Sequence, residues 1–167
     1  MQSQRVRKTS GFVFMLMVSL ASVCCYGNER QEEPPAVDFA GYNVEANSTT
    51  ERDLVKVGVW LTDQGKLVNA GLFYSRQRGE TVQYGVDIAA GYLTPVYRFW
   101  PFVEMGVKIG ADTSINNFHA EAYPKIGIAV PLSNRILIYV DYLYSYSTQG
   151  RRHDYSAASI GFVWGVE

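Results

Sequence analysis

The stretch VQYGVDIAAGY, residues 82–92, sorts its side chains in steps of two. One face carries valine, isoleucine, alanine and tyrosine, and the opposite face carries glycine, alanine, Gln83 and Asp87. A helix with 3.6 residues per turn would mix these two sets, whereas a β-strand points successive side chains to opposite faces. The stretch therefore predicts a β-strand with one apolar face and one polar, glycine-rich face.

The same alternation recurs from about residue 36 to the C-terminus. Seven stretches show it clearly, namely 55–62, 68–75, 82–92, 102–109, 125–132, 136–146 and 159–166. An eighth and weaker stretch is 36–46, in which Ala40, Tyr42, Val44 and Ala46 share a face. Outer-membrane barrels made from one bacterial chain have an even number of strands, and eight is the smallest. We therefore predict an all-β domain over residues 36–167, an eight-stranded antiparallel up-and-down barrel.

Composition excludes several other classes of protein. The length of 167 residues suits one domain, and the formal net charge of -1 lacks the basic excess of a nucleic-acid binder. Two adjacent cysteines, Cys24 and Cys25, cannot build a disulfide framework or a zinc ribbon. The sequence contains no phosphate-binding loop, nucleotide fingerprint or metal-spaced cluster of His, Asp and Glu. We expect no cofactor, no metal ion and no nucleic-acid partner.

Residues 1–27 have the organisation of a secretory signal peptide. Basic residues precede an apolar run of 13 residues, 11–23, which is shorter than the roughly 20 residues of a membrane-spanning helix. Small residues follow the apolar run, and they would fit cleavage after Gly27 or after Cys24. An uncleaved anchor and a lipid on Cys24 or Cys25 are alternatives. Removal of 1–27 leaves 12 basic and 16 acidic residues, a net charge of -4, and residues 28–35 would form a flexible lead-in.

The alternation alone leaves open which face of the barrel meets water. A soluble periplasmic barrel with a hydrophobic ligand would turn its apolar faces inward, and an outer-membrane barrel would turn them toward lipid. Glycine weakens a strand, so the glycine-rich polar faces have little use on an outer surface but make room for long side chains in a narrow interior. Tyrosines at the ends of the apolar faces suit the two membrane interfaces. We therefore expect Val86, Ile88 and Val107 to face lipid, and Asp87 and Lys108 to lie inside.

The charged residues of the polar faces form a predicted interior ionic network. Its members are Lys56, Asp87, Glu104, Lys108, Glu121, Lys125 and Asp141. The interior of an eight-stranded barrel is just wide enough for side chains to fill. Because unpaired buried charges are costly, we expect these groups to pair into a structural plug, with a path for protons or small ions as the alternative.

The last strand resembles the C-terminal signal by which outer-membrane barrels are recognised for assembly. Ser159, Gly161, Trp164 and Val166 fill its polar, glycine and hydrophobic positions, although the chain ends on Glu167 rather than on an aromatic residue. The segments PFVEMGV (101–107) and VDYLY (140–144) resemble small barrels of the OmpA/opacity type. This resemblance implies a location in the outer membrane of a Gram-negative bacterium, insertion by the barrel assembly machinery, and both termini on the periplasmic side.

The implied topology makes the connections alternate between the two sides of the membrane. Outward connections would lie near 47–54, 76–81, 111–117 and 147–154, and inward ones near 63–66, 93–96 and 132–135. All are short, which leaves little surface for binding a protein and favours a monomer. Four arginines fall in the outward connections and could bind lipopolysaccharide phosphates: Arg76, Arg78, Arg151 and Arg152.

Two barrels of similar size are enzymes that act on lipid A, and both use His and Ser near the outer rim. Here His153 lies near Ser156 and Asp154, but this spacing matches neither enzyme, so we assign no catalytic residue. His119 shares a face with Glu121, Tyr123 and Lys125, and we expect Pro124 to cause a bulge or a late strand start. The sequence favours a non-enzymatic, porin-like barrel of the envelope with a filled, polar interior. A soluble ligand-binding barrel and a lipid A-modifying enzyme are the alternatives.

Overall fold

A computed structural model describes residues 38–49, 52–77, 82–113, 118–148 and 154–166 of the chain. These residues lie in one compact unit, Pro34–Glu167. The predicted signal peptide, 1–27, and the lead-in, 28–35, are outside the described residues. Within the described ranges, no helix is long and apolar enough to cross a membrane.

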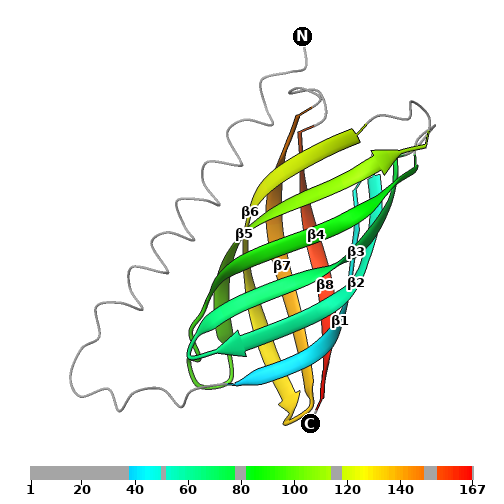
Figure 1. Ribbon diagram of the computed structural model, residues 1–167. Helices are drawn as coiled ribbons and strands as arrows, with labels where there is room; N and C mark the ends of the chain where they lie inside the picture. Colours follow the sequence, from blue (N-terminus) through cyan, green and yellow to red (C-terminus); the bar gives the residue numbers. More distant parts are fainter. Residues whose placement is uncertain (1–37, 50–51, 78–81, 114–117, 149–153, 167) are drawn as a thin grey trace. The chain divides into compact units, whose positions relative to one another are not determined.

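Eight β-strands form a closed barrel (Figure 1). They are β1 (Phe39–Ser48), β2 (Arg52–Asp63), β3 (Lys66–Gln77), β4 (Val82–Leu93), β5 (Trp100–Asp112), β6 (Phe118–Ser133), β7 (Ile136–Ser147) and β8 (Tyr155–Gly165). Each strand pairs antiparallel with the next in sequence, and β8 closes the barrel by pairing with β1. The predicted all-β, eight-stranded antiparallel up-and-down barrel is thereby confirmed, including the weak first strand.

The connections alternate between the two ends of the barrel. We call the end at which β1 begins and β8 finishes the C-terminal end, which is the lower end in Figure 1. It carries the β2–β3, β4–β5 and β6–β7 connections, and the other four connections lie at the opposite end. Beyond β8, the Val166 amide donates to the Ala40 carbonyl oxygen at 2.8 Å.

Several strands are longer than the alternation predicts. The expected connection 47–54 shrinks to three residues, so Arg52 belongs to β2, and Arg76 belongs to β3 rather than to a connection. The ladder continues through these polar ends because Asp53 pairs with both Ser48 and Arg76. Where the residues on both faces are polar, the alternation disappears and the end of the strand cannot be predicted from the sequence. The backbone groups there still need hydrogen-bond partners, so the ladder continues.

The expectation of a bulge or a late strand start at Pro124 was wrong. Strand β6 begins six residues earlier, at Phe118, and Pro124 pairs in unbroken register with Met105 of β5. The ladder to β7 lacks pairs at Tyr123 and Pro124 but keeps its register across the gap, so the missing proline N–H affects one side of the strand only. The register shift of this ladder lies instead between Pro131 and Ser133.

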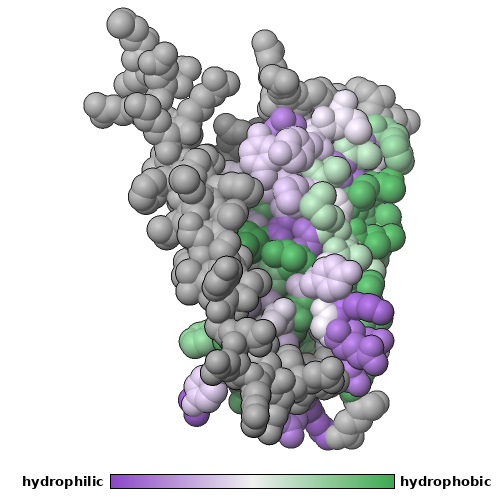
Figure 2. Space-filling view, turned by 90° about the vertical axis from the view of Figure 1, so that its left-hand side faces the viewer, coloured by the Kyte–Doolittle hydropathy of each residue, from purple (hydrophilic) through white to green (hydrophobic). Residues whose placement is uncertain are grey.

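The two faces of the barrel wall are oriented as predicted. Val86, Ile88 and Val107 are 43%, 58% and 44% exposed on the exterior, whereas Asp87 and Lys108 are buried. Figure 2 shows one side of this exterior, with hydrophobic residues along the wall. Apolar groups outside and charged groups inside are the reverse of a soluble protein.

Opposite charges bound the apolar wall on β2 and β3. Asp53 lies opposite Arg76 at one end, Asp63 lies opposite Lys66 at the other, and all four are exposed. The ten residue steps between the two aspartates span about 33 Å along the strand. At a strand tilt of about 40° this becomes about 25 Å along the barrel axis, the height of the apolar band in outer-membrane barrels.

Aromatic residues mark both limits of this band. Tyr42 pairs with Trp164 near the C-terminal end of the barrel, and Tyr74 pairs with Tyr84 near the other end. All four rings are more than half exposed. Aromatic girdles at two heights are typical of barrels in membranes, where amphipathic rings lie at the headgroup level.

Glycine permits a close approach of two strands. Gly58 of β2 lies directly opposite Gly71 of β3. A Cβ on Gly58 would lie 2.6 Å from the Gly71 Cα, so no larger residue fits without moving the backbone. Such glycine positions let a sheet of only eight strands curve into a closed barrel.

Candidate functional site

The interior is packed in three layers of inward side chains. Along the strands from the C-terminal end, β2 places Trp60, Lys56 and Arg52 inside, and β6 places Ala129, Lys125 and Glu121. We call these the apolar layer, the central ionic layer and the arginine layer. Trp60, Lys56 and Tyr123 are all 0% exposed and Arg52 is 7% exposed, so side chains fill the interior in each of the three layers.

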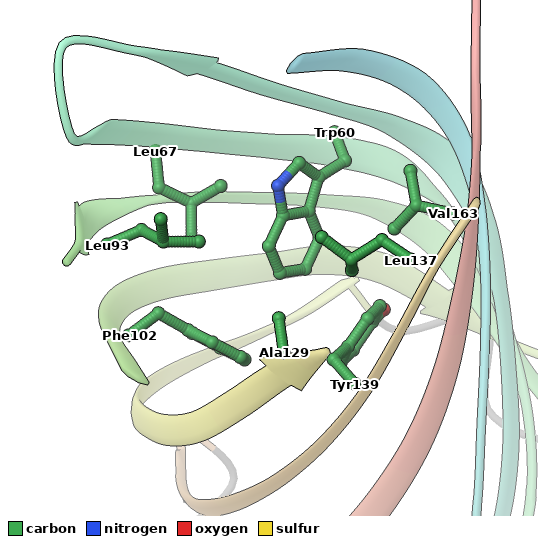
Figure 3. Close-up of a cluster of buried hydrophobic side chains, with 8 residues drawn as sticks. All are labelled: Trp60, Leu67, Leu93, Phe102, Ala129, Leu137, Tyr139 and Val163. Atoms are coloured by element: carbon green, nitrogen blue, oxygen red, sulfur yellow. The ribbon is translucent and has the colours of Figure 1, made fainter. Parts of the chain in front are cut away.

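The apolar layer seals the C-terminal end of the interior (Figure 3). Its buried members are Trp60, Leu67, Leu93, Phe102, Ala129, Leu137, Tyr139 and Val163. Three aromatic rings form its centre: the Trp60 ring lies 4.7 Å from that of Tyr139 and 5.3 Å from that of Phe102, the latter edge to face. Strands β2 to β8 all contribute a side chain, and Phe39 of β1 packs against the cluster.

The prediction of a polar interior was wrong for this layer. The inward faces of the strands alternate correctly, but near the C-terminal end they carry large apolar residues in place of charges. Trp60, Phe102 and Val163 each share a strand face with polar residues and glycines. The whole face was therefore predicted to be polar, and these apolar positions were missed. An apolar layer avoids the desolvation that a further set of buried ions would cost.

The central ionic layer is organised around Lys125. Its Nζ lies 2.8 Å from the Glu45 carboxylate, 3.4 Å from that of Asp141 and 3.8 Å from that of Glu104. These three carboxylates come from β1, β7 and β5 and are almost completely buried. The Tyr139 hydroxyl donates to Glu45 at 3.0 Å, which joins this layer to the apolar one. One ammonium therefore ties three strands together across the interior.

A second ion pair completes the central layer. Lys56 Nζ lies 3.4 Å from Asp87, which also accepts a hydrogen bond from the Tyr123 hydroxyl. The Tyr123 ring lies between cations, with Lys108 Nζ 4.7 Å and Lys125 Nζ 5.8 Å from its centroid. Cation–π contacts of this kind are strongest away from water, as here.

The arginine layer closes the network toward the opposite end. Arg52 Nη1 donates to Glu121 at 2.9 Å, and its Nη2 donates to Gln83. Glu121 also accepts from the Ser145 hydroxyl at 3.0 Å. The Arg52 guanidinium stacks 4.5 Å from the ring centroid of Tyr155, whose hydroxyl oxygen accepts from Lys108 Nζ at 2.9 Å.

The structure places all seven residues of the predicted network inside the barrel. They do not pair one to one with each other, since some bind residues outside the predicted set. Lys125 meets Glu104 and Asp141, and Lys56 meets Asp87. Lys108 and Glu121 face each other in register but bind Tyr155 and Arg52 respectively. Sequence reasoning missed Glu45 and Arg52. Glu45 could have been predicted, because it alternates with the apolar residues Val44 and Ala46 in the weak first strand. Arg52 could not, because it lay in a predicted connection.

Buried carboxylates outnumber buried cations among the described residues. Six acidic side chains are buried, compared with four basic ones. The basic residues are Lys56 and Lys125 in the central layer, and Arg52 and Lys108 in the arginine layer. Lys125 is shared by three of these carboxylates, whereas Lys108 binds the Tyr155 hydroxyl. Within the described ranges, no group of three or more His, Cys, Asp and Glu side chains is arranged to hold a metal ion.

The residues considered for catalysis are not assembled into a site by the described structure. His119 is buried edge to face against Phe73, and neither ring nitrogen has a hydrogen-bond partner there. His153 is outside the described residues. Asp154 accepts from the Ser147 amide, and Ser156 is exposed on β8.

The residues considered for lipid phosphate binding and assembly are only partly described. Arg76 is exposed at the end of β3, whereas Arg78, Arg151 and Arg152 are outside the described residues. Ser159, Gly161 and Trp164 lie in β8, with the first two inward and Trp164 61% exposed on the exterior. Val166 follows the end of the strand.

The fold has a counterpart among solved structures. A chain from the de novo design of transmembrane β-barrels superposes with a TM-score of 0.52 at 14% sequence identity, covering 80% of this chain and 99% of the designed one. At this identity the match shows the fold alone. No protein-family model matches the sequence, and no curated protein matches it. The finer resemblance to barrels of the OmpA/opacity type therefore stays a prediction.

Proposed function

We propose that this chain is an integral outer-membrane β-barrel of the Gram-negative envelope that acts as a structural, non-enzymatic and closed element. The observation that carries this proposal is the inverted wall: exposed apolar side chains on all eight strands enclose ten buried charged residues. Such an exterior is stable in contact with hydrocarbon, and a closed barrel pairs backbone groups between neighbouring strands, as a membrane-spanning structure requires.

The packed interior supports the closed, structural role. Buried side chains of all three layers fill the interior and most of the buried ions are paired, so the part of the barrel that the structure describes offers no open pathway comparable to that of a porin. The lipid A-modifying alternative needs an accessible nucleophile and base; of the two histidines, His119 is 1% exposed and His153 is outside the described residues. We propose lipids, including lipopolysaccharide near Arg76, and the barrel assembly machinery acting on β8 as the partners of a monomer.

The first test is the location and state of the protein. The mature protein should fractionate with outer membranes, and it should migrate differently in gel electrophoresis before and after boiling. Lipid A from cells with and without the protein should have the same acylation in mass spectrometry. Recovery in the soluble periplasm would contradict the membrane placement, and changed acylation would contradict the non-enzymatic role.

Replacing Ile88 with Lys tests the lipid contact directly. Ile88 is 58% exposed and lies midway along β4 between Tyr84 and Tyr92, so it would be near the bilayer midplane. A lysine there should lower the free energy of unfolding from lipid vesicles by about 2–4 kcal/mol, measured in urea titrations. The matched control Asn134→Lys, in the exposed β6–β7 turn, should change it little. Equal stability of the two variants would indicate a water-facing wall.

A further inference from the structure

The connection between β4 and β5 differs from the other two turns at the C-terminal end. It forms a small hairpin in which the Val96 amide donates to the Phe99 carbonyl oxygen at 2.8 Å and the Phe99 amide donates back at 3.0 Å. Tyr97 and Arg98 therefore form a two-residue tip. The β2–β3 and β6–β7 turns have polar tips, Gln64–Gly65 and Asn134–Arg135.

The backbone of this tip is strained. Tyr97 has a φ of 57°, in the left-handed region that a bulky residue enters at a cost of about 1–2 kcal/mol. In the β2–β3 turn, Gln64 also has a positive φ, 48°, and it is followed by Gly65 at 78°. Glycine would adopt the φ of Tyr97 without this cost, so the turn itself does not require a tyrosine at position 97.

The tip exposes apolar and cationic groups together. Tyr97 is 87% exposed, Phe99 57% and Val96 45%. The exposed Arg98 guanidinium lies 5.5 Å from the Tyr97 ring centroid, in cation–π contact. Tyr92, earlier on β4, is 67% exposed on the exterior, and Trp164 on β8 is a further exposed aromatic residue at the same end of the barrel, at 61%.

We propose that the Val96–Phe99 tip is an interfacial anchor that binds phospholipid headgroups of the leaflet at the C-terminal end. Tyr97 and Phe99 lie among the carbonyl groups of the lipids, where amphipathic and aromatic rings are favoured. Arg98 pairs with a lipid phosphate through its planar guanidinium. The inference rests on the proposed membrane placement, and it adds a lipid-binding site that pins the height of the barrel in the bilayer.

Site-specific fluorescence tests the anchor in the full chain. Residues 38–167 contain no cysteine, so with Cys24 and Cys25 changed to serine each new cysteine carries a single environment-sensitive label. We would label Tyr97→Cys, Asn134→Cys in the polar turn, and Val107→Cys on the wall, in phosphatidylcholine vesicles with and without lipid spin-labelled near the headgroup. The label at 97 should show blue-shifted emission and loss of intensity with the spin label, and the label at 134 should show neither.

The three positions separate failure of the anchor from failure of the membrane placement. A lipid-shielded label at 107 with a water-exposed label at 97 would overturn the anchor alone, leaving the tip free for a periplasmic protein or polymer. A water-exposed label at 107 would overturn the membrane placement and the anchor together.

Arg98 has its own test in the Tyr97→Cys background. Arg98→Glu should reverse the blue shift and the quenching of the label by repelling lipid phosphate, whereas Arg98→Lys should retain most of both. The control Arg135→Glu, in the neighbouring turn, should leave the label at 97 unchanged. An unchanged signal in Arg98→Glu would overturn the phosphate contact.

Discussion

Replacing Lys125 with Met should destabilise the barrel by about 3–5 kcal/mol, the usual cost of removing one partner from a buried ionic group. The substitution leaves the carboxylates of Glu45, Asp141 and Glu104 buried without the ammonium that they share. Lys56 cannot replace it, because it is engaged with Asp87. Equilibrium unfolding in urea from lipid vesicles, followed by tryptophan fluorescence and by the gel shift, measures the loss.

Two further variants make this result specific to the ionic layer. Lys66→Met removes an exposed lysine at the start of β3 and should have little effect. Adding Glu45→Gln to Lys125→Met removes one uncompensated charge, so the double variant should be more stable than Lys125→Met alone. If Lys125→Met is as stable as Lys66→Met, the ionic layer does not hold the barrel together.

Replacing Gly161 with Val should lower the stability by about 3 kcal/mol through overpacking. Gly161 of β8 lies directly opposite Tyr139 of β7, and a Cβ at this position would overlap the tyrosine ring. The ring cannot retreat easily, since it packs 4.7 Å from the Trp60 ring and its hydroxyl donates to Glu45. Refolding yield and urea midpoint in detergent micelles measure the effect.

The contact with the ring predicts a compensating change. Tyr139→Ala combined with Gly161→Val should lose less than the sum of the two single effects, by about 0.5–3 kcal/mol. Ala158→Val, on the same strand but with its side chain exposed on the exterior, is the matched control and should be close to neutral. Additive losses in the double variant would show that the glycine is needed for a reason other than the Tyr139 ring.

Much of the fold follows from the local pattern around particular residues. The alternation of Val86, Asp87 and Ile88 predicts the strand and its two faces, because the two-residue period is a property of the extended backbone. Glycines beside Lys108 and Lys125 indicate that those faces lie in a crowded interior. Strand ends such as Arg52 and Arg76 escaped prediction, because a polar residue carries no sign of whether the ladder continues through it.

By itself, the sequence determined that this protein is an eight-stranded barrel, since each strand shows its own two faces, and the glycines on the charged faces indicated that those faces lie inside. Only the tertiary structure decided which charges meet. Lys125 and Glu45 are 80 residues apart and come together because closure of the barrel aims β6 and β1 at the same height of the interior. It also decided that the C-terminal end of the interior is apolar, because that layer exists only when Trp60, Phe102 and Tyr139 converge from separate strands. Strand register and barrel closure set these meetings, and neither is a local property of the chain.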